Sequence, residues 1–198
     1  MKRETFADSA SLNKSNSCTP KLDGERMRKY KAFSVAFSYP DDNFFKFFPK
    51  LLNEREVLVS LYDRLFRREE IWLYTTEYLA ENEFQRANAL ADIMGFYRAF
   101  KLEPDKKRPD SLEAELEFMH YLIFKKIHVD RLGKGVDEKS FICLDAQKKF
   151  FNEHIYPGAN KIVNKISLQM GSNFYSDTAK ELLNFLKSEK RYLGKSLR

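Results

Sequence analysis

Residues 88–126 read NALADIMGFYRAFKLEPDKKRPDSLEAELEFMHYLIFKK, and this stretch decides the fold. Two segments with apolar residues at helical spacing flank a charged connector that contains proline. A period of 3.6 residues places positions three and four apart on one helix face. The stretch therefore predicts two amphipathic helices. Their apolar faces are formed by Leu90, Ile93, Met94, Tyr97 and Phe100 in the first, and by Leu112, Leu116, Met119, Ile123 and Ile127 in the second, with Leu122 at the margin.

Two acidic residues in the second segment need an explanation. Glu115 projects between Leu122 and Met119, within the apolar stripe, and a buried charge needs a partner. The plain interpretation is a boundary glutamate that turns out to water or pairs with Lys126. Asp110 precedes the helix, with Glu113 three residues later, and this pattern predicts a helix cap. A role in binding is the alternative for both carboxylates.

Composition predicts one all-α domain. The chain has 198 residues, 43% of them hydrophobic and 15% aromatic, so it can bury a large core without metals or disulfides. Only 7 glycines and 6 prolines interrupt apolar runs that keep a helical rhythm. We expect a helical bundle of about 8–10 helices over residues 22–198, after a disordered polar tail over residues 1–21.

The helix boundaries follow from the apolar periodicity and from Gly and Pro. A solvent loop is expected over residues 128–139, and residues 156–158, Tyr-Pro-Gly, are expected to be the sharpest interruption. The predicted helices lie at about residues 24–39, 51–66, part of 71–79, 83–100, 112–127, 145–154, 159–170 and 177–188.

The chain has few groups for catalysis or for binding a metal. Cys18 and Cys143 form neither a metal-ligand cluster nor a disulfide framework. Neither do the three histidines have metal-ligand spacing. Alternate residues on a helix point about 200° apart, so the glutamates at positions 113, 115 and 117 cannot act together on one bond. We predict no enzyme, no metal site and no cofactor.

The location is predicted from what the chain lacks. The first residues include Glu4 and Asp8 and contain no apolar segment of the kind that a secretory signal needs. No apolar run approaches the roughly 20 residues that cross a bilayer. The expected location is the cytoplasm.

Positive charge raises an alternative function. The chain carries 35 Lys and Arg against 29 Asp and Glu, a net charge of +6 and a pI of about 9.1. A basic, all-helical nucleic-acid-binding or regulatory protein is therefore the second candidate. The basic residues are scattered in short groups, and no recognition-helix or RNA-binding signature accompanies them.

The central stretch resembles a known family. FYRAF at residues 96–100, Pro109-Asp110 and ELEFM at residues 115–119 are similar to motifs of the TorD/DmsD/NarJ family, in the branch that serves dimethyl sulfoxide reductase-type enzymes. Weaker similarity extends over most of residues 25–188. The family consists of all-helical cytoplasmic chaperones for molybdenum-containing reductases, so the resemblance implies a chaperone and no catalysis.

The resemblance also implies a partner and a site. The partner would be the twin-arginine signal peptide, and the apo form, of a molybdopterin-containing catalytic subunit, bound by a monomer or a homodimer. Its receptor should offer an apolar groove bordered by acids that bind guanidinium groups. The implied signal-peptide-binding residues are Asp110, Glu115, Phe118, Met119, Leu122 and Tyr97, and further local attraction would come from Glu113, Glu117 and Asp92.

The chain departs from the family pattern at two places. Ser111 stands where many members have histidine, and residues 156–158 stand where a tryptophan is common. The motif predicts that Glu115→Gln weakens binding of the signal peptide with little change in melting temperature. It also predicts that Met119→Ala weakens both folding and binding.

Overall fold

The computed structural model describes residues 19–68, 71–103, 108–132, 136–169 and 171–195. Within these ranges the all-α prediction is confirmed, since the β-type pairing there is an isolated bridge between Tyr74 and Ser111. The α-helices are α1 (Thr19–Ala36), α2 (Asp42–Phe47), α3 (Arg55–Asp63), α4 (Thr76–Leu79), α5 (Glu83–Ala99), α6 (Leu112–Leu132), α7 (Val136–Phe150), α8 (Tyr156–Gln169) and α9 (Phe174–Lys195). A 3-10 helix, η1 (Pro49–Glu54), and two π-helical turns, η2 (Arg64–Arg68) and η3 (Phe151–Ile155), complete the described elements.

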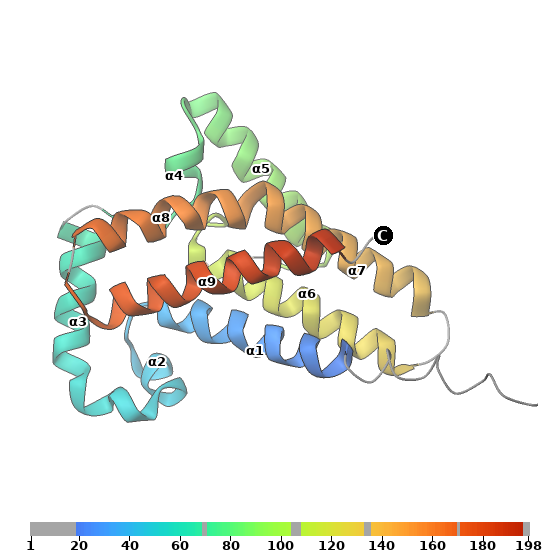
Figure 1. Cartoon of the computed structure of the whole chain (residues 1–198). Helices are drawn as coiled ribbons and strands as arrows, with labels where there is room; N and C mark the ends of the chain where they lie inside the picture. The colour runs from blue at the N-terminus through green and yellow to red at the C-terminus, as the bar shows by residue number, and fades with distance from the viewer. Residues whose placement is uncertain (1–18, 69–70, 104–107, 133–135, 170, 196–198) are drawn as a thin grey trace, which may run out of the picture.

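The long helices form the body of the molecule (Figure 1). Helix α6 packs against α1 on one side and against α7 on the other, and α8 and α9 pack together as neighbours. Helices α2 and α3 close one end, while α4 and α5 project from the body. Helix α6 therefore lies at the centre of the arrangement, with one face toward the core and another toward the surface.

The core is mostly aliphatic and aromatic and consists of one large and one small cluster. One cluster of buried side chains joins α1, α5, α6, α8 and α9, and a small second cluster joins Phe44, Phe45 and Leu58 near α2 and α3. Among the described helices, none combines the length and the apolar composition that crossing a membrane requires. The expected tail at residues 1–21 lies mostly outside the described residues, and its last three residues belong to α1.

Three expectations about boundaries were wrong. The expected loop at residues 128–139 is largely helical, because α6 continues to Leu132 and α7 begins at Val136; residues 133–135 lie outside the described residues. The expected interruption at residues 156–158 is the first turn of α8. Pro157 fits there because the widened turn η3 comes directly before it and replaces the regular i→i−4 hydrogen bonds. The expected helix at residues 51–66 is divided among η1, α3 and η2.

Candidate functional site

The start of α6 is attached to an extended segment at residues 71–75. The Thr75 amide donates to the Asp110 carbonyl at 2.9 Å, and the Leu112 amide donates to the Leu73 carbonyl at 2.8 Å. This pairing explains why residues 71–75 are not helical, although their apolar pattern predicted part of a helix. The backbone groups there bind the chain that leads into α6.

The side chain of Asp110 also joins the start of α6 to the region after the extended segment. Its carboxylate is fully buried and accepts from the Thr76 hydroxyl at 2.5 Å. Arg108 donates to both of its oxygens, at 3.0 and 2.8 Å. The predicted cap was wrong, because Ser111 caps α6 by accepting from the Ala114 amide at 3.2 Å. Asp110 is thus a clamp between α4 and the start of α6.

Glu115 is fully buried under the same segment. Its Oε1 accepts from the Thr75 hydroxyl at 2.7 Å, and its Oε2 has no hydrogen-bond partner in the part of the chain that the structure describes. Burial raises the pKa of this carboxyl well above its ordinary value; the Thr75 hydroxyl opposes the increase, and the Asp110 charge adds to it. Glu115 therefore carries its proton at pH values where an exposed glutamate has lost it.

The expected partner of Glu115 was wrong. Lys126 donates to Asp23 at 3.1 Å and to Asp130 at 2.8 Å. Glu115 therefore neither turns out to solvent nor pairs with Lys126, since its side chain lies inside the core.

Thr75 is fixed from its other side by Gly158 of α8. A methyl group placed on Gly158 would lie 2.6 Å from the Thr75 Cγ2 and would overlap the Thr75 Cβ. Only glycine allows this approach of α8 to the extended segment. Thr75 is thus packed between Gly158 and the carboxyl of Glu115.

The six predicted binding residues form two layers. Asp110, Glu115, Met119 and Leu122 are fully buried and have no exposed surface. Tyr97 and Phe118 are almost fully buried, but both line an open groove on the surface of α6. Their rings pack edge to face with centroids 4.8 Å apart, and the Tyr97 hydroxyl donates to the Pro109 carbonyl at 2.7 Å.

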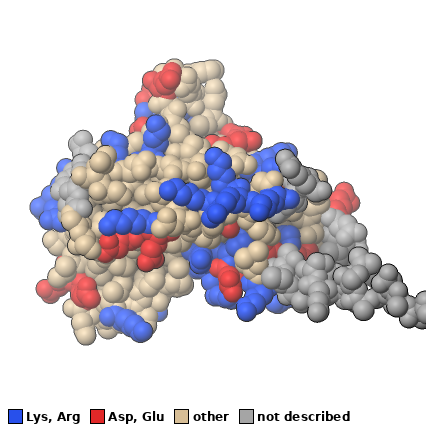
Figure 2. Space-filling view, viewed as in Figure 1, with Lys and Arg blue, Asp and Glu red and all other residues tan. Residues whose placement is uncertain are grey.

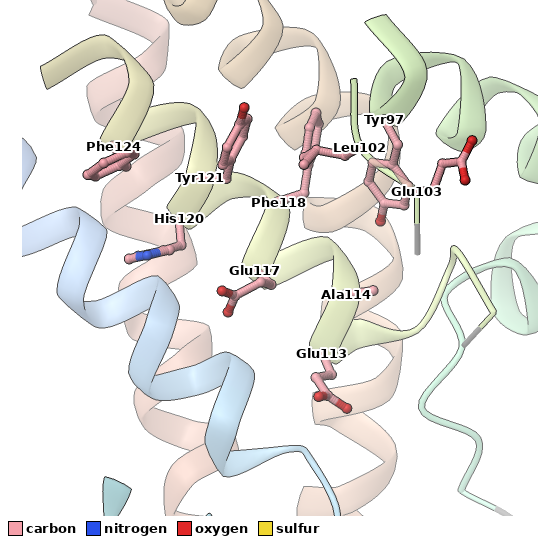
Figure 3. Close-up of a pocket in the computed structure, with 10 residues that line it drawn as sticks. All are labelled: Tyr97, Leu102, Glu103, Glu113, Ala114, Glu117, Phe118, His120, Tyr121 and Phe124. Atoms are coloured by element: carbon pink, nitrogen blue, oxygen red, sulfur yellow. The ribbon is translucent and has the colours of Figure 1, made fainter. Parts of the chain in front are cut away.

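This groove, the α6 groove, has a volume of about 490 Å³ (Figure 3). One wall is the outer face of α6, and the other comes from α5 and the segment after it. Mostly apolar side chains form its floor, and three carboxylates stand around it. The lining residues are Tyr97, Leu102, Glu103, Glu113, Ala114, Glu117, Phe118, His120, Tyr121 and Phe124.

Two residues of the groove connect α6 to α1. Glu117 accepts from the Lys31 ammonium with both oxygens, each at 2.8 Å, and its side chain is still 42% exposed. His120 donates from Nδ1 to the Met27 carbonyl at 2.9 Å. In Figure 3 both side chains point toward α1. The groove therefore has one acid that is paired with a lysine but remains accessible to solvent.

A second cavity, the aromatic pocket, lies beyond Glu113, which lines both. It has a volume of about 560 Å³ and contains two arginines over tyrosine rings: Arg67 lies 4.8 Å from the Tyr39 centroid and Arg108 4.3 Å from the Tyr74 centroid. Both guanidinium groups already have acidic partners. The remaining lining residues are Phe37, Tyr62, Phe66, Trp72, Leu73 and Ser111.

Sequence reasoning missed Tyr121, Phe124 and His120 as groove residues. With Glu113 and Glu117 they recur at helical spacing on a face of α6 beside the apolar stripe. That spacing could have identified a shared face. It could not have predicted that α5 and residues 102–103 form a second wall.

Two comparisons with known sequences bear on the function. A family model described as nitrate reductase delta subunit matches residues 44–162, more than half of the chain. The match includes α5, the extended segment and all of α6. No curated protein matches the chain.

Proposed function

This chain belongs to the nitrate reductase delta subunit family, the group of NarJ/TorD-type chaperones, and from that membership we propose a specific partner and a binding site for it on this chain. Proteins of this family assist the maturation of molybdoenzymes and are not catalysts, so the prediction of a non-enzyme is confirmed. The proposed partner is the apo catalytic subunit of a molybdopterin-containing oxidoreductase. The chain binds its twin-arginine leader in the cytoplasm and delays export until the cofactor is inserted.

The α6 groove is the observation that carries this proposal. A twin-arginine leader combines a guanidinium pair with an apolar segment. The groove combines an apolar floor, which includes Phe118, Tyr121 and Phe124, with carboxylates of Glu113 and Glu117 one helical turn apart. An amphipathic helix bound in a groove is a common mode of peptide recognition. The two parts of the leader therefore match the two kinds of surface.

The proposed affinity comes mainly from the apolar segment. Micromolar binding corresponds to about 8 kcal/mol. A few buried Leu-sized side chains at about 2 kcal/mol each approach that value before ordering is counted. The carboxylates then select arginine, since guanidinium binds carboxylate with two parallel hydrogen bonds. An arginine at Glu117 must compete with Lys31, which donates only as a point charge.

The six predicted binding residues divide into two that a leader can contact and four that lie beneath the groove. Tyr97 and Phe118 can touch a leader in the groove. Asp110, Glu115, Met119 and Leu122 lie beneath it, and we propose that they hold α6 in place. A direct contact between the leader and these four residues stays a prediction, because it requires the extended segment or α6 to move.

Family membership does not favour the nucleic-acid alternative. The face in Figure 2 carries acidic groups among its lysines and arginines. Nucleic-acid binding would weaken steeply with salt, whereas capture of an apolar segment would not. A salt series on the complex therefore separates the two functions.

The test is calorimetry with a synthetic leader that has an Arg-Arg pair before about a dozen apolar residues. We expect micromolar binding to the full chain. Tyr121→Ala should lower the affinity about tenfold through lost apolar contact. Glu117→Gln should lower it about three- to tenfold for this peptide and much less for a Gln-Gln version of it.

Two variants outside the groove serve as controls. Phe84→Ala removes an aromatic ring that is 76% exposed at the start of α5, and Glu181→Gln removes an exposed carboxylate on α9. Both should bind like the wild type. Equal losses in the control and the groove variants would place the leader elsewhere. Equal effects of Glu117→Gln on both peptides would show that this carboxylate does not read arginine.

Co-purification from the native cell identifies the client. Recovery of a molybdopterin-containing subunit supports the proposal, and recovery of RNA supports the alternative. The predicted dimethyl sulfoxide reductase branch, and the choice between monomer and homodimer, stay predictions that the same complex would test.

A further inference from the structure

Three possible metal ligands that do not line the α6 groove lie close together in the structure. Asp92 comes from α5, and Glu153 and His154 come from the π-helical turn η3. One donor atom from each lies within 4.8 Å of the others. The Nε2 of His154 is 2.8 Å from an Asp92 carboxylate oxygen. Sequence spacing predicted no metal site, since Asp92 is far from the other two along the chain.

The histidine is rigidly placed. Its side chain is only 8% exposed, and its ring packs against Phe96 of α5 and Phe150 of α7, with centroids 5.8 and 5.1 Å apart. Single π-helical turns are frequent at functional sites. Here the turn brings the adjacent side chains of Glu153 and His154 to the same carboxylate of Asp92. The imidazole is therefore held in place before any ligand binds.

The carboxylates are on the solvent side of this ring. The Asp92 side chain is 57% exposed, and Glu153 is also exposed. Two carboxylates around one imidazole give the cluster a negative charge even if the ring is protonated. The chain as a whole is positive, with a net charge of +6, so this concentration of negative charge is local. An ion can reach it directly from water.

We propose that Asp92, Glu153 and His154 bind one divalent transition-metal ion of the Zn²⁺ type. Zinc takes imidazole nitrogen and carboxylate oxygen at about 2.0–2.2 Å, and it completes its shell with water. Three donors within 4.8 Å of one another can converge on such an ion by small rotations of the two exposed carboxylates. The hydrogen that His154 now offers to Asp92 moves to Nδ1, so that the Nε2 lone pair faces the metal.

Such an ion would link α5 to the turn before α8. Helix α5 carries Tyr97, which lines the α6 groove, so the metal would fasten one wall of that groove to the core. This role goes beyond leader binding and does not depend on it. The link predicts that the metal raises the thermal stability of the chain whether or not a leader is present.

The test is calorimetric titration of the full chain with ZnCl₂, with CoCl₂ as a spectroscopic probe. We expect one ion per chain, a higher melting temperature, and cobalt absorption bands of a site with nitrogen and oxygen ligands. His154→Gln and Asp92→Asn should each weaken binding at least tenfold. Glu153→Gln should weaken it less, because water can replace one carboxylate.

His128→Gln is the matched control. His128 is exposed on α6 and stacks on Phe124, so it represents an ordinary surface histidine. This variant should bind zinc like the wild type. Loss of binding in the control, or unchanged binding in Asp92→Asn and His154→Gln, overturns the proposal, as does an absence of zinc binding at millimolar concentration. Asp92→Asn and Glu153→Gln change exposed side chains, so they keep the test decisive if His154→Gln does not fold.

Discussion

The two faces of α6 use the same type of side chain in opposite ways. Glu115 and Glu117 are two residues apart and point about 200° away from each other. Glu115 is fully buried against Thr75, whereas the Glu117 side chain is 42% exposed and paired with Lys31. On the inner face burial raises the pKa of the carboxyl and so favours its protonated form, and on the outer face a cation and water compensate the charge.

Within one motif, the buried Glu115 therefore has a structural role, and the exposed Glu117 has the role in recognition that we propose. The carboxyl inside the core binds the extended segment through Thr75 and is not accessible to an arginine from outside. A carboxylate at the surface can exchange its lysine partner for another cation. A motif match at Glu115 therefore identifies the helix α6. We propose that Glu113 and Glu117, two residues away on either side, contact the leader.

The largest effect should come from removing a side chain on the inner face. Met119→Ala leaves a cavity in the core, because Met119 is fully buried, and should lower the free energy of unfolding by about 2–5 kcal/mol. Tyr121→Ala, on the outer face, should lower it by less than about 1.5 kcal/mol, because Tyr121 is only partly buried. Urea denaturation of the pair measures the contrast. Equal losses would mean that the two faces are not different in packing.

A smaller effect should follow from crowding the segment that covers Glu115. Gly158→Ala places a methyl group against Thr75, whose Cβ cannot move without the backbone. We expect a loss of about 1–3 kcal/mol. The double variant Gly158→Ala, Thr75→Ser should recover part of this loss, since serine lacks the methyl group that overlaps. Full stability in Gly158→Ala would show that the segment is free to shift.

Much of the fold could be predicted from periodicity. The helix predicted at residues 83–100 is α5 within one residue, because its cap, Asn82, is typical and its buried residues, Ile93 and Tyr97, recur at helical spacing. Prediction failed where contacts with neighbouring elements determine the ends of a helix. Glycines near residue 133 favoured a long loop, whereas the packing of α7 on α6 extends both helices toward each other. Pro157 favoured a break, whereas a π-helical turn accommodates it.

The site could be predicted only in part. The position of Glu115 inside an apolar stripe correctly indicated a carboxyl that needs a partner. The partner, Thr75, is 40 residues away in a segment whose pattern predicted a helix. The spacing of Asp110 predicted a helix cap, but its side chain accepts hydrogen bonds from Arg108 and from Thr76, which is distant in the sequence. Local patterns do not contain such pairings, because they depend on which loop covers the start of α6.

The charge on Glu115 itself should make the stability of the chain depend on pH. An unfolded glutamate loses its proton near pH 4.3, whereas burial raises the pKa in the folded chain. Above that pH the folded state holds a proton that the unfolded state has released, so stability falls with pH, by up to about 1.4 kcal/mol per pH unit, until the folded pKa is passed. Glu115→Gln has no proton to hold. Its free energy of unfolding relative to the wild type should therefore rise in urea titrations as the pH increases above 5, until the folded pKa is passed, and a constant difference would mean that the buried carboxyl is ionised. At the pH where both proteins are equally stable, weaker leader binding by Glu115→Gln would mean that this buried group acts on the leader, and equal binding would confine that role to the outer face.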